Sequence, residues 1–430
     1  MKKILLLIPL MLAACGGTTK EPPLAGKRID ILGEESTIEP NPAASRITML
    51  LPDAEKNRDW AQPMANAQHL PQHMYISQEV NKAWSLRSGR VFSRVVNTPV
   101  IHAGRLFVLN SGSVVKAFSS QTGKELWEKR LPVAKGEGSD FIGGLAVAGD
   151  RIFATSPNGQ VFSLSASEGE VIWDVDVGAP LRSAPTVVKD QLIVMSHDNR
   201  LFALDVRQGN LLWTHSGITE TLSMASGATP AISGDTVIVP YTSGDLYALQ
   251  LKDGQYVWHA ALNRLNMRAL GKGVQGFAAS PVISGNVVVA ATVDGVVAAF
   301  DLSTGRRLWK TDISTSQTPW VAGNVLFVLS EEGRLFALNL EDGEVRWISD
   351  LNSYVDADER DKPRFWSGPV LAGGRLIVVA NNAFAMSLDP RTGRKLLATR
   401  IVNGFVSVRP IVAEGGLYFY TDDGRIIKFK

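Results

Sequence analysis

Short apolar runs separated by turn pairs recur along most of this chain, and the clearest copy covers residues 280–309. It reads SPVISGNVVVAATVDGVVAAFDLSTGRRLW, with the turn pairs Gly285–Asn286 and Asp294–Gly295 between its apolar runs. Runs rich in valine and alanine that are bounded by such pairs are typical of β-strands joined by short turns. The stretch therefore predicts one β-meander.

A glycine stands four residues before a large apolar residue in seven copies of this frame. The variants DLSTG and DPRTG, which end at Gly305 and Gly393, show the turn best. We expect a hairpin with a bulge, because its left-handed position costs any side chain roughly 1–2 kcal/mol. The pairs are Gly123/Trp127, Gly169/Trp173, Gly209/Trp213, Gly254/Trp258, Gly305/Trp309, Gly343/Trp347 and Gly393/Leu397.

The tryptophans of these copies recur about every 40–50 residues, with four short strands in each interval. This period is typical of a β-propeller blade and not of a helical solenoid. We expect the indoles to wedge each sheet against the next. The expected docking residues are Trp84, Trp127, Trp173, Trp213, Trp258, Trp309 and Trp347.

The two ends of the repeated region complement each other. Residues 409–430 form an eighth copy that stops before its fourth strand, and residues 80–86 form an unmatched strand around Trp84. Pairing the two would remove an open sheet edge and lock the ring. The fold class predicted is an all-β, eight-bladed propeller of four-stranded antiparallel blades, with the last blade closed by the strand around Trp84. The alternative is seven blades and a separate hairpin.

The N-terminus has the parts of an export signal. Lys2 and Lys3 precede an apolar run, and small residues end it at Ala14. The Leu-Ala-Ala-Cys ending resembles the bacterial lipobox, in which the cysteine is acylated; the alternative is an ordinary cleaved signal. Cys15 is the only cysteine, so it is the expected lipidation site and no intrachain disulfide can form. Gly16 at the next position resembles lipoproteins that are sent to the outer membrane.

Three regions follow from these patterns: residues 1–14 as a lipoprotein signal peptide, 15–76 as a lipid-anchored tether and loosely packed lead-in, and 77–430 as the propeller. The middle region is rich in proline and has little periodicity. The full chain has 44 basic and 42 acidic residues, and removal of Lys2 and Lys3 leaves 42 of each. A neutral mature chain without charged runs argues against nucleic acid as a partner.

Signals for catalysis, for a cofactor and for a metal site are weak. The chain has no phosphate-binding loop, no GxSxG elbow and no HExxH motif. His69 and His73 have i,i+4 spacing, but Pro71 lies between them and would spoil a helix, so we expect a surface loop. Acidic residues gather in one connection, where a solvated loop explains them better than a paired-carboxylate site; they are Asp350, Asp356, Asp358, Glu359 and Asp361.

The connections between blades vary most in length. Residues 259–279 and 348–367 are long, whereas Trp309 is followed after only ten residues by Pro319. In a propeller these connections leave on one face. Long loops of opposite charge on that face, without a catalytic set, indicate a docking surface.

The repeated frame, xPVxxGxxxxVxxxxGxxxALDxxTGxxxW, resembles the blades of pyrroloquinoline-quinone dehydrogenases. With the lipobox and eight copies, the chain resembles the lipoprotein B subunits of the β-barrel assembly machine of Gram-negative bacteria. That resemblance implies a monomeric scaffold within a complex, lipid-anchored to the outer membrane on its periplasmic side. It also implies docking to periplasmic domains of the central barrel subunit and assistance in inserting outer-membrane proteins.

Two alternatives stay open beside this reading. One is a quinoprotein-type dehydrogenase, although the family's adjacent cysteines are absent here. The other is a lipid-anchored propeller that binds a different envelope protein or a glycan.

The resemblance also implies a partner contact at Leu181 and Arg182, because a Leu-Arg pair before a Ser-Ala-Pro-Thr strand touches the central subunit in that family. Arginine would supply a forked donor and leucine an apolar anchor; the alternative is an ordinary loop beside a strand. The next connection, Thr214–Ala228, departs from the family's acidic pattern and offers only Glu220.

Overall fold

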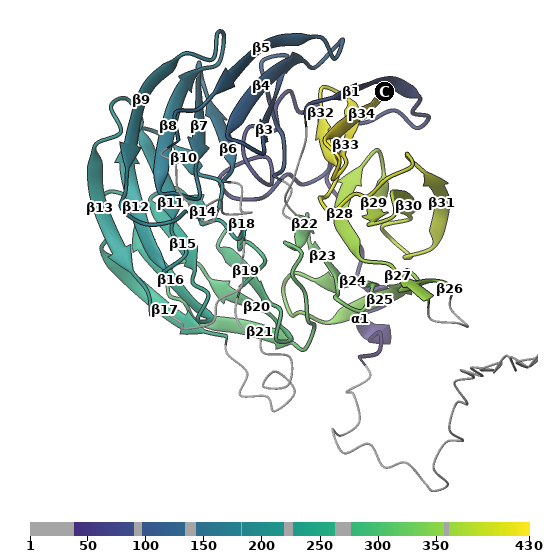
Figure 1. Cartoon of the computed structure of the whole chain (residues 1–430). Helices are drawn as coiled ribbons and strands as arrows, with labels where there is room; N and C mark the ends of the chain where they lie inside the picture. The colour runs from purple at the N-terminus through teal and green to yellow at the C-terminus, as the bar shows by residue number, and fades with distance from the viewer. Residues whose placement is uncertain are drawn as a thin grey trace, which may run out of the picture. The chain divides into compact units, whose positions relative to one another are not determined.

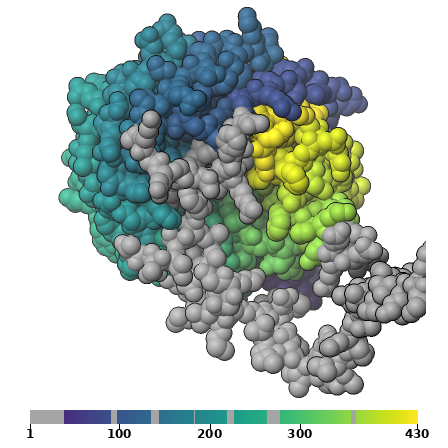
Figure 2. Space-filling model, viewed as in Figure 1, coloured from purple at the N-terminus to yellow at the C-terminus, as the bar shows by residue number. Residues whose placement is uncertain are grey.

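The computed structural model describes residues 38–89, 97–133, 143–181, 183–218, 227–262, 277–356 and 361–430. Eight four-stranded antiparallel sheets follow one another around a ring (Figure 1). Figure 2 shows that the last blade, in yellow, returns to lie beside the first part of the ring. The prediction of an eight-bladed all-β propeller is confirmed.

In each blade the first strand is the sheet edge that faces the inside of the ring, and the fourth strand is the outer edge (Figure 1). Blade 1 contains β2 (Val100–His102), β3 (Arg105–Asn110), β4 (Val114–Ser119) and β5 (Glu125–Arg130). Blade 2 contains β6 (Leu145–Ala148), β7 (Arg151–Thr155), β8 (Gln160–Ser165) and β9 (Val171–Asp176). Blade 3 contains β10 (Thr186–Val188), β11 (Gln191–Met195), β12 (Arg200–Asp205) and β13 (Leu211–Ser216). Blade 4 contains β14 (Ala231–Ser233), β15 (Thr236–Pro240), β16 (Asp245–Gln250) and β17 (Tyr256–Ala261).

The second half of the ring repeats this order. Blade 5 contains β18 (Val282–Ser284), β19 (Val287–Thr292), β20 (Val296–Asp301) and β21 (Arg307–Thr311). Blade 6 contains β22 (Trp320–Ala322), β23 (Val325–Leu329), β24 (Arg334–Asn339) and β25 (Val345–Asp350). Blade 7 contains β28 (Trp366–Ala372), β29 (Arg375–Ala380), β30 (Phe384–Leu388) and β31 (Lys395–Arg400). Blade 8 contains β32 (Ile411–Ala413), β33 (Gly416–Tyr420), β34 (Arg425–Phe429) and β1 (Lys82–Arg87).

The strand around Trp84 closes the ring, as predicted. β1 pairs antiparallel with β34, and Trp84 lies opposite Lys428. Asn81 and Lys430 extend this pairing, since each backbone N–H donates to the carbonyl of the other at 3.1 and 2.9 Å. The alternative of seven blades and a separate hairpin is therefore wrong.

The repeated glycine closes a bulged hairpin before each outer strand of blades 1–7. In blade 5, Gly305 has φ +72° and its N–H donates to the carbonyl of Asp301 at 2.8 Å. The pairing of β20 with β21 shifts register between Ala299 and Phe300, which is the expected bulge. The same shift occurs at the equivalent place in the other six blades.

Each tryptophan lies against the glycine of the next blade. A Cβ added to Gly343 would come within 2.5 Å of the Trp309 ring, so the indole occupies the space that a side chain would need. Its Nε1 donates to the carbonyl of Leu340, three residues before that glycine, at 2.8 Å. Five further indoles make the same bond to the next blade; they belong to Trp127, Trp173, Trp213, Trp258 and Trp347.

The interface between blades 8 and 1 differs in its polar contacts. The carbonyl equivalent to these acceptors belongs to Ser120, and it accepts from the buried Lys428 Nζ at 2.8 Å. That ammonium also lies 5.0 Å from the ring centre of Tyr418. Trp84 packs on Gly123, but among the described residues its Nε1 has no partner. A lysine therefore takes the place of the indole N–H where the ring closes.

Residues 55–75, which we call the inner loop, circle the inside of the ring and contact all eight blades. The contacts join them to equivalent positions of the first strands, at the last-but-one residue of the strand in every blade except blade 6. From blade 1 to blade 8 the pairs are Trp60–Ile101, Ala61–Val147, Gln62–Val187, Ala67–Ile232, Gln68–Ile283, Gln72–Trp320, Met74–Leu371 and Asn57–Val412. The first strands are sheet edges, so these bonds satisfy groups that would otherwise be unpaired.

The inner loop also closes on itself. The N–H of Glu55 donates to the carbonyl of His73 at 3.0 Å, and the N–H of Tyr75 donates to Glu55 at 2.8 Å. Trp60, Met64 and Met74 are buried in the same apolar cluster as the strands of blades 6, 7 and 8. Residues 38–76 therefore correct the expectation of a loosely packed lead-in.

The chain reaches the inner loop along blade 6. The one helix of the described residues, α1 (Pro42–Arg46), lies beside β25 (Figure 1). Asn41 caps it and donates from its backbone to the carbonyl of Val345 at 2.7 Å. Arg346 donates to the carbonyl of Ile47, and its burial lowers its pKa. These contacts cover the outer edge of this one blade.

Candidate docking face

The two faces of the ring carry different parts of the chain. Antiparallel strand order places the turn after the first strand at one end of each blade and the connection to the next blade at the other. The inner loop bonds to turns of the first kind: Ala103 N–H donates to Asp59 Oδ1 at 2.9 Å, and Gly373 N–H donates to the Met74 carbonyl at 2.9 Å. We call this end the inner-loop face and the opposite end the connection face.

The connection face has a cavity of about 580 Å³ between blades 6, 7 and 8. Phe365 and Phe405 line it, and each side chain is 63% exposed. Both are held by their backbones, since Asn381 N–H donates to Phe365 and Asp422 N–H donates to Phe405, each at 2.8 Å. Exposed aromatic side chains on a fixed backbone are typical of protein-docking surfaces.

Polar groups surround these two phenylalanines. Asp422 accepts from the hydroxyl of Ser407 at 2.6 Å, and its partial burial raises the pKa of its carboxyl group. Glu331 accepts from the backbone of Ser316 at 2.6 Å. The sequence did not predict this cavity, because its residues come from three blades. The only hint in the sequence was that several of them lie in connections between blades.

The long connection of residues 348–367 contains a hairpin that the sequence did not predict. β26 (Tyr354–Asp356) pairs with β27 (Asp361–Pro363), and Asp356 lies opposite Asp361. Asp350 accepts from the backbone of Asn352 at 2.7 Å. Asp358 and Glu359 lie outside the described residues, as does most of the other long connection, residues 259–279.

The structure treats the two expected partner-contact residues differently. Leu181 is 3% exposed, packs among core residues of blades 2 and 3 and forms an isolated bridge with Ser196. Its side chain is therefore part of the core. Arg182 lies outside the described residues. Glu220 in the next connection lies outside them too, and so does Cys15.

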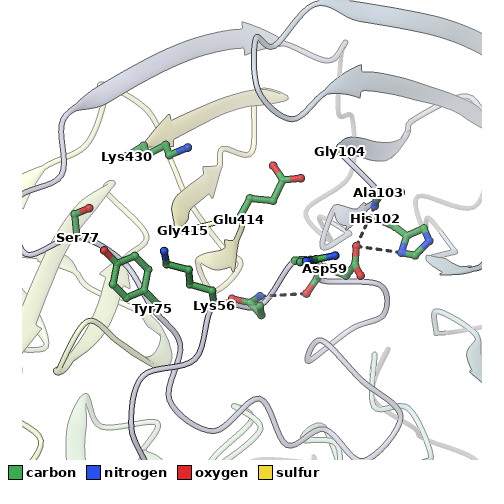
Figure 3. Close-up of a pocket in the computed structure, with 12 residues that line it drawn as sticks. Lys56, Asp59, Tyr75, Ser77, His102, Ala103, Gly104, Glu414, Gly415 and Lys430 are labelled. Atoms are coloured by element: carbon green, nitrogen blue, oxygen red, sulfur yellow. Dashed lines mark hydrogen bonds and ion pairs between the residues drawn. The ribbon is translucent and has the colours of Figure 1, made fainter.

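A second cavity, of about 760 Å³, lies on the inner-loop face where blades 8 and 1 meet (Figure 3). Asp59 Oδ1 lies 3.1 Å from His102 Nδ1, and Glu414 accepts from the Ser120 hydroxyl at 2.6 Å. Lys56 lies 4.9 Å from the ring centre of Tyr75. Each of these charged groups already has a partner within the protein, and the geometry forms neither a carboxylate pair nor a nucleophile with its base.

His69 and His73 belong to the inner loop, which corrects the expectation of a surface loop. His69 is buried, with Nδ1 2.7 Å from the Pro281 carbonyl and Nε2 3.2 Å from Thr229 Oγ1. Burial lowers its pKa to about 4. His73 contacts the Pro52 carbonyl and accepts from Gly374 N–H. Within the described residues, no group of histidine, cysteine and acidic side chains could hold a metal ion.

Comparison with known proteins identifies the family. A family model described as outer membrane protein assembly factor BamB matches residues 110–349 and 355–430. The chain is 29% identical over 222 residues to a protein of that name from Moranella endobia, covering 50% of this chain and 57% of that one. It is 24% identical over 350 residues to the protein of that name from Escherichia coli, covering 80% and 87%. The chain thus spans under three fifths of the first relatives that it matches.

Solved structures with low identity share the fold. BamB from Moraxella catarrhalis has a TM-score of 0.69 and 19% identity, with 82% of this chain and 100% of that one covered. Quinohemoprotein alcohol dehydrogenase from Comamonas testosteroni has a TM-score of 0.68 and 14% identity, with 90% and 83% covered. The family model matches well over half of the chain. The chain therefore belongs to the outer membrane protein assembly factor BamB family.

Proposed function

We propose that the protein is a non-catalytic scaffold of outer-membrane protein assembly. In this role it docks periplasmic domains of the central barrel subunit and assists the insertion of outer-membrane proteins. The family match over residues 110–349 and 355–430 carries the proposal. The ring supports it physically, because eight interlocked blades form a rigid body whose connection face carries exposed Phe365 and Phe405. An enzyme of the quinoprotein type is the alternative, and the likeness to those dehydrogenases is one of fold alone.

The docking proposal is tested by reversing the charge at Arg182. We expect Arg182→Glu to weaken binding of the periplasmic domains of the central subunit by about tenfold or more, because the substitution removes a forked donor and reverses a charge at the proposed contact. Surface plasmon resonance with the purified domains measures the change. Arg58→Glu is the matched control, since Arg58 is exposed and belongs to the inner loop on the opposite face. Equal affinities for the wild type and Arg182→Glu would remove this residue from the interface.

We also propose that the protein is anchored to the outer membrane, on its periplasmic side, by acyl chains on Cys15. No helix among the described residues is long and apolar enough to span a membrane. Several acyl chains hold a protein stably on a bilayer, whereas one holds it only marginally. We expect Cys15→Ser to move the protein from the washed membrane fraction to the soluble periplasmic fraction. Membrane retention of this variant in cells that lack the central subunit would contradict the lipid anchor.

A further inference from the structure

The residue that lies three positions before the last-but-one residue of each first strand is small in seven blades and is an arginine in the eighth. Seven of these residues directly precede the first strand or the proline before it, and Gly368 lies within β28, before Pro369. In blade order they are Thr98, Gly144, Ala184, Thr229, Ser280, Thr318, Gly368 and Arg409. Equivalent positions of a propeller form a circle around its axis. Blade 8 therefore contributes one long cationic side chain to a circle of small residues.

Arg409 has donors that the protein leaves unused. Its Nη2 donates to the carbonyls of Thr318 and Gly368 at 3.0 and 3.5 Å. Its Nη1 is buried without a partner among the described residues, and no carboxylate in them forms an ion pair with the guanidinium. Burial lowers the pKa of Arg409 to about 10, which still leaves it charged at neutral pH. A buried charge without an opposite charge is costly, so an anion that joins it would be held strongly.

Hydroxyl groups continue from the arginine around the circle. Ser280 N–H donates to Thr318 Oγ1 at 3.1 Å, and Thr229 N–H donates to Ser280 Oγ at 2.9 Å. These oxygens accept from backbone, and among the described residues no acceptor takes the hydroxyl proton of Thr318. The chain of contacts ends at His69, whose low pKa keeps it neutral and which Arg409 repels when charged. This part of the circle thus offers two donors, the Thr318 hydroxyl and Arg409 Nη1, and one positive charge.

The cavity on the connection face leads toward this circle. Its lining includes Gln317 and Ser367, the residues directly before the two carbonyls that Arg409 binds. Its own carboxylates, Glu331 and Asp422, accept from Ser316 and Ser407. Arg409 as a whole residue is only partly buried, although its Nη1 is buried. A small molecule that enters from this face can therefore approach the guanidinium.

We propose that Arg409, with the Thr318 hydroxyl beside it, binds the oxyanion of a small molecule, a carboxylate or a phosphate group, near the axis of the ring. The planar fork of arginine matches the two oxygens of such a group. The site is independent of the docking function, because it needs no partner protein.

The test compares the thermal stability of the full chain in sodium phosphate, in sodium malonate and in sodium chloride at equal ionic strength. We expect at least one of the oxyanions to raise the Tm of the wild type by at least about 2 °C over chloride, because a ligand that binds only the folded state stabilises it. Arg409→Gln should lose this rise. In chloride, Arg409→Gln should be at least as stable as the wild type, because it removes an unpaired buried charge.

Arg375→Gln is the matched control, since Arg375 also donates to two backbone carbonyls, those of Ser77 and Gln78, and burial also lowers its pKa. It should keep the full rise. Absence of a rise with both oxyanions in the wild type, or equal rises in the wild type and Arg409→Gln, would overturn the proposal. If Arg409→Gln does not fold, Arg409→Lys keeps the charge without the fork and should show a smaller rise; an undiminished rise would overturn it as well.

Discussion

Replacing Trp60 by alanine is expected to lower the free energy of unfolding by about 3–5 kcal/mol. Trp60 is 0% exposed although it lies outside every blade. Its backbone exchanges two hydrogen bonds with Ile101, at 2.7 and 2.8 Å, and its ring belongs to the apolar cluster that spans the last blades. Alanine would leave a cavity where the inner loop meets blades 8 and 1. Urea unfolding followed by circular dichroism measures the loss.

The matched control is Lys56→Ala in the same loop. Lys56 is exposed, and its contact with Tyr75 is a surface cation–π interaction worth about 0.5–1 kcal/mol. We expect a loss of that size or less. If Trp60→Ala and Lys56→Ala have equal midpoints, the inner loop is not part of the cooperative core.

Replacing Trp309 by alanine is expected to cost a similar amount, about 3–5 kcal/mol. The ring fills the space above Gly343, and its Nε1 bond to Leu340 ties blade 5 to blade 6. The substitution removes the apolar contact and leaves the Leu340 carbonyl without this donor. Differential scanning calorimetry on the purified chain reports the change as a lower Tm.

Blade 7 provides the control for this second substitution. Leu397 holds the position of the tryptophan, yet it is 63% exposed and every residue of β31 is exposed. Leu397→Ala should therefore cost less than about 1 kcal/mol. If Leu397→Ala lowers the stability as much as Trp309→Ala, the loss comes from the position in the repeat and not from an indole packed on a glycine.

Blades 7 and 8 lack the contact between an indole and a hairpin glycine. The order of the strands along the chain explains why. Blade 8 takes its outer strand from the N-terminal side, so no hairpin glycine precedes β1. Val80 stands four residues before Trp84, where the other blades have glycine. Without that glycine, an indole at position 397 would have no space on the next blade in which to pack. Leu397 at this position is accordingly exposed.

The sequence was sufficient for the blades because their determinants are local. Gly305 closes a bulged hairpin, and Trp309, which packs against the next blade, follows it only four residues later. The strand around Trp84 was found as the complement of an incomplete last copy, since an unpaired sheet edge requires a partner. The first feature is visible in a short window of residues, and the second in a comparison of the two ends of the repeated region.

The inner loop could not be found in this way. Each blade meets it through only a few bonds, so residues 55–75 have neither strand alternation nor helical period. His69 illustrates the difficulty, because its partners Pro281 and Thr229 are more than 150 positions away in the chain. A proline-rich segment without hydrophobic periodicity has the same composition in a tether and in a packed loop, so composition could not distinguish the two.

The candidate site residues also came partly from the sequence and partly from the structure. The family resemblance directed attention to Arg182, but only the structure showed that its neighbour Leu181 is part of the core. Phe365 and Phe405 line one cavity from two different connections, and Arg409 bonds to carbonyls of two other blades. By itself the sequence determined the eight repeated sheets, because turn chemistry acts between near neighbours, and the strand that closes them, because an incomplete last copy requires a partner strand. The tertiary structure alone decided which segment lines the ring and which charge lies there unpaired, because burial depends on contacts between residues far apart in the chain.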